Sequence, residues 1–184
     1  MKKALIVLAI FILITGCSEE VEVGIDSKVE ETKLSYLEIK DDLTNKEEFN
    51  NVEDIDFTIT SRINRISEEE ISYRVIIDNP KVNMHDVQAL LIHNNFTEDI
   101  FPSIGIFDDK TSLLVDNEDL KGIELVGYIE TTKKLKDLDI ELRLWLKYLD
   151  DDNEEHEIYY KIEDIEYNDL EEKKDNSTQD VIVE

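Results

Sequence analysis

The feature that most constrains this chain is a repeated alternation of apolar and polar residues between positions 53 and 167. The clearest example is residues 139–149, DIELRLWLKYL, in which every second residue is apolar. Successive side chains of a strand point to opposite faces, so this period predicts a strand with one buried and one wet face. Related patterns recur at residues 54–66, 71–78, 87–93, 111–115, 122–130 and 156–163.

About seven short strands without a long helical pattern predict an all-β domain over residues 53–167. Among such folds the spacing favours an antiparallel, immunoglobulin-like sandwich. The single cysteine of the chain excludes the disulfide of true immunoglobulin domains. Trp145 also falls on a late strand rather than on an early central one. The prediction therefore concerns the architecture and not membership of that family.

The segments on either side of the domain are acidic. Residues 17–52 are predicted to be a flexible tether, because their low apolar content cannot offset the entropy of ordering. One weakly amphipathic patch (Leu34, Leu37, Leu43 and Phe49) leaves a short helix open within it. As a coil, this tether would span roughly 30–35 Å. Residues 168–184 are predicted to be a disordered acidic tail.

The N-terminal residues have the pattern of a signal peptide. Two lysines are followed by an uninterrupted apolar run at residues 4–14. That run is shorter than the roughly 20 residues that a membrane-spanning helix needs, and it fits the apolar part of a signal peptide over residues 1–16. The next stretch, Ile14-Thr15-Gly16-Cys17, resembles the lipobox of bacterial lipoproteins, with Ile14 where leucine is more common.

The lipobox resemblance implies a specific processing route. A diacylglyceryl group is added to the Cys17 thiol, and cleavage between Gly16 and Cys17 makes Cys17 the first residue of the mature protein. The resemblance thus implies an extracytoplasmic protein on the outer face of the bacterial cell membrane. The absence of a second cysteine agrees with an attachment role, because one thiol cannot form an internal disulfide. Two acyl chains anchor a protein stably, whereas one holds it weakly.

The charge restricts the partners. The chain has a formal net charge of −26, which repels nucleic-acid phosphates and excludes nucleic-acid binding. The same charge favours cations and basic partners, or serves as a solvated coat. The richness in Asn, Ile, Lys, Glu and Asp is typical of a low-GC Gram-positive bacterium.

The acidic run at residues 150–155 is a candidate for weak calcium binding through Asp150, Asp152 and Glu154. It is not an EF-hand, because Glu155 stands where that loop needs glycine and Lys161 stands where it needs glutamate. A solvated turn between two strands is the competing interpretation. No cofactor is expected, and a calcium or small-solute module remains one alternative function.

The sequence gives no motif for catalysis or for a transition metal. His85 and His93 would lie about 26 Å apart on one extended strand, too far to share an ion. No GxSxG, P-loop, HExxH or CxxC sequence is present. We therefore expect no metal site, no catalytic residue and no enzyme. A cell-wall enzyme with an unrecognised pair of carboxylates is the second alternative.

The candidate partner surface consists of Trp145, Tyr159 and Arg143. Trp145 and Arg143 share the wet face of their strand, and Tyr159 matches it on the next strand if the pair forms a hairpin. Exposed aromatic and arginine side chains are common anchors for a partner. The alternative is that a second layer, for instance residues 94–110, covers Trp145. The main prediction is a membrane-anchored, non-enzymatic binding or assembly domain with a protein partner at the cell envelope.

Overall fold

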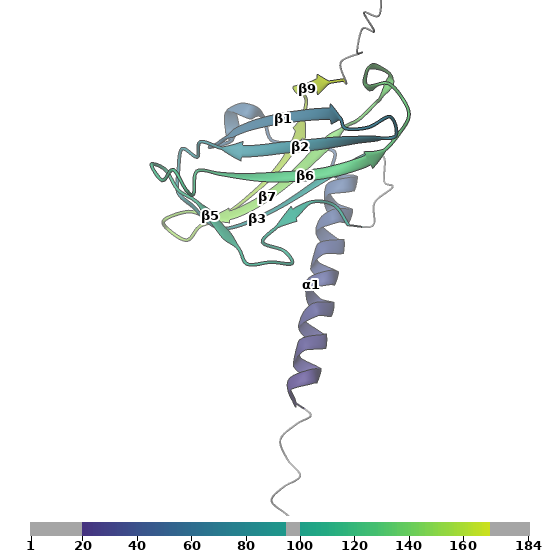
Figure 1. The fold of residues 1–184 in the computed structure, drawn as a ribbon. Helices are drawn as coiled ribbons and strands as arrows, with labels where there is room; N and C mark the ends of the chain where they lie inside the picture. The colour runs from purple at the N-terminus through teal and green to yellow at the C-terminus, as the bar shows by residue number, and fades with distance from the viewer. Residues whose placement is uncertain (1–19, 95–99, 170–184) are drawn as a thin grey trace, which may run out of the picture.

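The computed structural model describes residues 20–94 and 100–169 (Figure 1). The expected signal peptide, the lipobox with Gly16 and Cys17, and the C-terminal segment from residue 170 lie outside the described residues. Within these ranges, one long helix, α1 (Glu20–Asn45), precedes nine strands and two short 3-10 helices, Val52–Asp54 and Leu135–Asp137. The strands are β1 (Thr58–Arg65), β2 (Glu70–Asp78), β3 (Met84–His93), β4 (Ser103–Ile104), β5 (Thr111–Leu113), β6 (Gly122–Glu130), β7 (Leu142–Leu149), β8 (Glu155–Ile162) and β9 (Ile165–Asn168).

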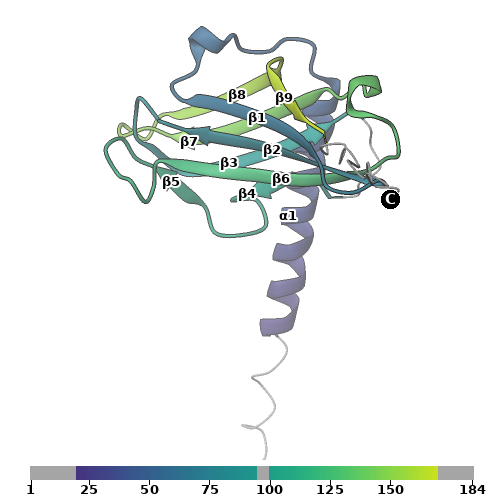
Figure 2. The same cartoon turned by 45° about the horizontal axis from the view of Figure 1, so that its top comes forward.

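The strands form two sheets that face each other, with β1, β2 and β6 in front of β3, β7 and β8 in Figure 2. The first sheet has the order β6-β2-β1-β9, and the second has the order β4-β3-β7-β8 with β5 also pairing β3. Neighbouring strands are antiparallel, apart from the parallel pair β1 and β9. The mostly β fold in two antiparallel sheets agrees with the sequence prediction.

Each of the seven predicted stretches overlaps a strand. The two strands that the pattern missed, β4 and β9, are two and four residues long, too short to show an alternation. The main core lies between the sheets and combines side chains such as Tyr73 and Val75 of β2 with Leu144 and Leu146 of β7. Gly127 of β6 is required there, because a Cβ would lie 2.2 Å from Cζ of Tyr73.

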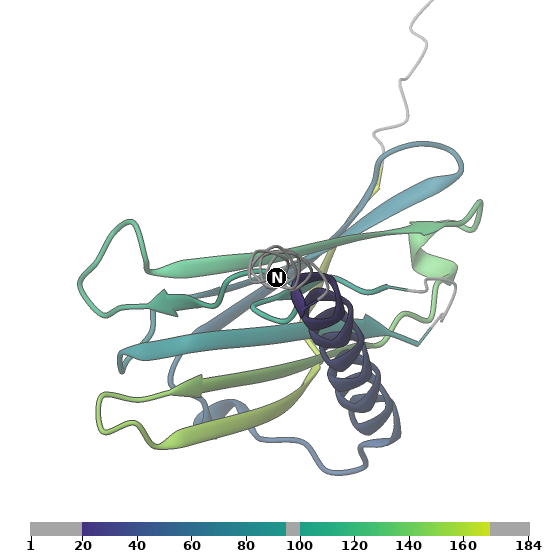
Figure 3. The same cartoon turned by 90° about the horizontal axis from the view of Figure 1, so that it is seen from below.

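Helix α1 corrects the prediction of a flexible tether. Residues 20–45 form one continuous helix that runs across the strands, contacts β3 and β7, and projects beyond the sandwich (Figures 1 and 3). The coil prediction failed because Tyr36 and Leu43 are buried against the outer face of the second sheet. That contact supplies the apolar burial that the segment lacks when it is considered alone.

Candidate functional site

The outer face of the second sheet is the candidate site, because it carries all three residues of the predicted partner surface. Strand register places Trp145 of β7 between Leu90 of β3 and Tyr159 of β8. Arg143 lies two positions along β7 on the same face, opposite Ile92 of β3. The predicted parity of these side chains is therefore confirmed.

The burial of Trp145 decides between its two interpretations, an exposed anchor for a partner or a side chain covered by a second layer. Only 2% of Trp145 is exposed, so it is not an exposed anchor for a partner. It belongs to a second core, formed between the sheet and helix α1, whose buried members are Tyr36, Leu43, Leu90, Ile92, Phe101 and Trp145. A second layer does cover Trp145, as the alternative proposed. Residues 100–107 contribute Phe101 and Ile106 to that layer, but α1 provides the other wall.

Arg143 binds the C-terminal end of α1. Its Nη1 donates to the carbonyl oxygens of Thr44 at 2.6 Å, Leu43 at 3.3 Å and Lys46 at 3.4 Å. The last carbonyls of a helix lack intrahelical partners and carry the negative end of its dipole. No basic residue of α1 lies in its last turn. Arg143, which lies about a hundred residues later in the chain, supplies the positive charge there.

Glu141 orients Arg143. The Nε of Arg143 donates to Oε1 of Glu141 at 2.6 Å, and Lys161 of β8 pairs with the second carboxylate oxygen. The hydrogen bond from Lys161, followed by that from Arg143, holds the pKa of Glu141 below its usual range despite partial burial. The carboxylate is therefore ionised at neutral pH and keeps the guanidinium directed at α1.

Tyr159 makes the third contact with α1. Its hydroxyl donates to Oδ2 of Asp42 at 2.5 Å and lies 3.0 Å from Oε1 of Glu157. Nζ of Lys46 sits 3.5 Å from the centre of the tyrosine ring, within the range of a cation–π contact. Burial and the two carboxylates raise the pKa of Tyr159, so the phenol remains a neutral donor.

Two further hydrogen bonds lie at this interface. Nε1 of Trp145 donates to Oε1 of Glu157 at 2.7 Å, which satisfies the only polar atom of the buried indole. The backbone N–H of Phe101 donates to the hydroxyl of Tyr36 at 2.8 Å. Each of the three residues assigned to a partner surface thus contributes to the helix-covered face, and their binding partner is a helix of the same chain.

The acidic hairpin is organised by its own side chains. Oδ1 of Asp150 accepts the backbone N–H groups of Asp152 and Glu154, both at 2.9 Å, and Oδ2 lies 2.8 Å from Nε2 of His156. The contact with His156, followed by the backbone donors, lowers the pKa of Asp150. Asn153 adopts the left-handed conformation at φ 59°, as a tight turn requires. Of the three candidate calcium ligands, Asp150 is engaged by these donors, and Asp152 and Glu154 are exposed.

The histidines occupy three separate environments. His156 stacks on Tyr148 with ring centres 4.9 Å apart. Nε2 of His85 lies 2.9 Å from Oδ1 of Asp151, and this contact lowers the pKa of that carboxyl. His93 is buried at the other end of β3 between the rings of Tyr73 and Phe101. Within residues 20–94 and 100–169, no three His, Cys, Asp or Glu side chains come together to hold a metal ion.

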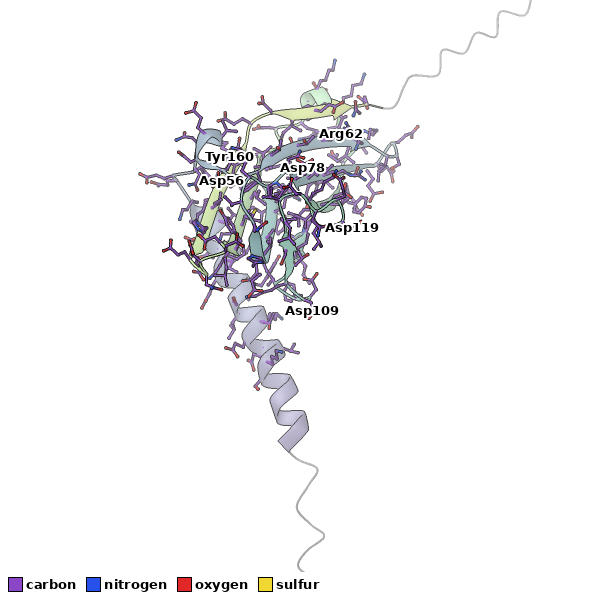
Figure 4. The ribbon with its side chains drawn as sticks, turned by 90° about the vertical axis from the view of Figure 1, so that its left-hand side faces the viewer. Asp56, Arg62, Asp78, Asp109, Asp119 and Tyr160 are labelled. Atoms are coloured by element: carbon purple, nitrogen blue, oxygen red, sulfur yellow. The ribbon has the colours of Figure 1, made fainter. Side chains whose placement is uncertain are left out.

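Many of the acidic side chains of the domain lie on its surface, such as Asp109 and Asp119, which extend from loops (Figure 4). In the part of the chain that the structure describes, no helix combines the length and apolarity needed to cross a membrane. Comparisons with protein-family models and with curated proteins found no match to this chain. The functional argument therefore depends on the sequence signals and on the geometry of α1 and the sandwich.

Proposed function

We propose that this protein is a lipid-anchored, extracytoplasmic bacterial lipoprotein in which α1 is a stalk that presents a non-enzymatic β-sandwich for binding or assembly. The observation that carries the proposal is the position of α1. The helix begins at Glu20, three residues after the lipobox cysteine, and among residues 27–45, whose side chains the structure describes, the first one buried on the sandwich is Tyr36. The preceding part of the helix extends about 24 Å at 1.5 Å per residue.

The docked end of α1 supports a stalk rather than a loose tether. Arg143, Tyr159 and Leu43 fix the last turns of the helix to the sheet through hydrogen bonds and burial. A domain docked in this way has a defined orientation relative to the axis of α1. A flexible coil would leave that orientation free.

We further propose that the sandwich has immunoglobulin-like topology. The order β6-β2-β1 in one sheet corresponds to strands E, B and A, and the order β3-β7-β8 corresponds to C, F and G. The short strands β4 and β5 both pair with β3, at the edge where the second sheet is extended in variable-type domains. β9 is an addition to this scheme, because it returns to the first sheet beside β1.

A binding or assembly role is favoured over catalysis because the polar groups of the candidate site serve structure. The guanidinium of Arg143 is directed at helix carbonyls, and the phenol of Tyr159 is directed at Asp42. Asp150 of the hairpin is held by backbone donors and His156. The sheet face that α1 leaves uncovered, with Tyr128 exposed on β6, is the surface we assign to the envelope partner.

The anchor is tested by expressing the full chain in a Gram-positive host with radiolabelled palmitate. The wild type and a Ser18→Ala control should be labelled and should partition into detergent. The Cys17→Ala variant should remain unlabelled and should retain its signal peptide. An unlabelled wild type, or a Cys17→Ala variant that is cleaved normally and still fractionates with the membrane, contradicts the proposal.

The binding role is tested separately by photo-cross-linking in intact cells. A benzoylphenylalanine at Tyr128 should give one discrete adduct that mass spectrometry identifies as an envelope protein. The same probe at Glu118, in the loop before β6, is the matched exposed control and should not give that adduct. If neither Tyr128 nor Thr60, which lies on the same open face, yields a discrete adduct that is absent at Glu118, the binding role fails while the anchor can still stand.

A further inference from the structure

An open groove of about 810 Å³ lies beside α1 where the helix leaves the sandwich. One wall is the helix, with Val29, Tyr36 and Leu37, and the other contains Ile100 and Phe107. The rings of Tyr36 and Phe107 approach to 5.0 Å and join the two walls. Ile100 is 67% exposed and Phe107 is 50% exposed, so this corner presents large apolar side chains to water.

The charge of the groove is opposite to that of the chain. The three lysines of α1, Lys28, Lys33 and Lys40, all line it, and among residues 20–94 and 100–169 no acidic side chain does. Among the described residues, no carboxylate forms an ion pair with any of these three lysines. In a chain of net charge −26, such a basic, apolar groove selects an occupant that combines carboxylates with a short apolar run.

The C-terminal segment of this chain has that chemistry. Residues 170–184 read LEEKKDNSTQDVIVE, and three consecutive branched apolar residues precede Glu184. The residues between Asp169 and Val181 can extend roughly 40 Å. A domain of this size has a radius of gyration of about 13 Å, so the segment can reach the far side of the sandwich.

We propose that the groove binds the C-terminal segment 170–184 of the same chain. Val181, Ile182 and Val183 pack against Val29, Leu37 and Phe107, while the side-chain carboxylate of Glu184 pairs with the lysines of α1. The inference stands without the lipid anchor, because it depends only on the groove and on the sequence of the tail.

The test uses the mature chain, residues 17–184, with Cys17→Ser to keep it unlipidated. Amide spectra of this protein are compared with those of its V181S/I182S/V183S variant. The triple change should shift the amide signals of Val29, Lys33, Leu37 and Phe107. The matched control N176A/S177A/T178A lies in the same tail and should leave those signals in place. Both variants retain every described contact of the fold, so misfolding does not confound the comparison.

A second experiment reverses the charge of the groove lysines and gives an independent readout. K33E/K40E should bring the amide signals of Val181 to Val183 to their positions in a free peptide of residues 170–184, whereas K134E/K136E should not. Unchanged groove signals in V181S/I182S/V183S overturn the proposal. Shifts that disappear on twentyfold dilution assign the groove to the tail of a second copy and also overturn it. Phosphatidylglycerol vesicles that perturb the groove equally in wild type and V181S/I182S/V183S point to a lipid occupant and contradict it as well.

Discussion

Replacement of Leu43 by alanine should detach α1 from the sandwich. Leu43 is 0% exposed and packs in the second core with Trp145. Removing its three outer carbons forfeits about 2.4 kcal/mol of transfer free energy at ~0.8 kcal/mol per carbon, and the cavity raises the total to roughly 3–5 kcal/mol. That loss corresponds to a roughly 140- to 4,000-fold weaker docking equilibrium, because about 1.4 kcal/mol is a factor of ten.

Fluorescence reports this detachment directly, because Trp145 is the only tryptophan of the chain and lies beneath α1. In Leu43→Ala, the emission should shift to the red and acrylamide should quench it at low urea, before the strands unfold by circular dichroism. Leu34→Ala is the matched control, since it makes the same change on the same helix at a side chain that is 55% exposed. If both variants protect Trp145 equally from quenching, the assignment of Leu43 to the docking interface is refuted.

Three further changes probe the polar contacts of the same interface. Arg143→Gln should weaken docking by about 1.5–3 kcal/mol, the value of a charged hydrogen bond, while Lys147→Gln on the same strand should change Trp145 quenching little. Glu141→Gln should lower the free energy of unfolding at pH 7. Because Lys161 and Arg143 lower the pKa of this carboxyl, the difference from the wild type should fade as the pH drops below the ordinary pKa of 4.5. Urea titrations at pH 7 and pH 3 measure this difference. Tyr159→Phe should cost about 0.5–1.5 kcal/mol at pH 7. Because the pKa of Tyr159 is raised in the docked state, docking of α1 in the wild type should weaken above pH 10.0, the ordinary pKa of tyrosine, as the unfolded phenol ionises. Curves of Trp145 quenching at alkaline pH should show this added loss in the wild type and not in Tyr159→Phe.

The strands were accessible from the sequence because their signal is local. In β7, each inward side chain from Leu142 to Tyr148 is apolar, and the period of two is the geometry of the strand itself. The same parity correctly placed Trp145 and Arg143 on the outer face. Parity assigns a side chain to a face, but it does not reveal whether that face meets water or another element.

Helix α1 was missed because its stabilising contacts are not local. The sequence patch drew attention to Leu34, Leu37 and Leu43, but only Leu43 of these is buried. Among residues 27–45 of α1, Tyr36, a residue outside that patch, is the other buried side chain. The burial of one narrow face against strands that lie far along the chain is a tertiary effect, and no periodicity within residues 17–52 reveals it.

The composition of α1 explains why the helix depends on its contact with the second sheet. Asp41 and Asp42 lie near its C-terminal end, where negative charge opposes the helix dipole. Arg143 reverses that cost at the carbonyls of Leu43 and Thr44, and Tyr159 binds one of the two aspartates. Forming the first turn of a helix is unfavourable, whereas each added residue extends it at little cost. The docked end therefore acts as the nucleus from which the exposed part of α1 extends, so a variant that frees Trp145 should lose the helicity of the stalk together with its orientation.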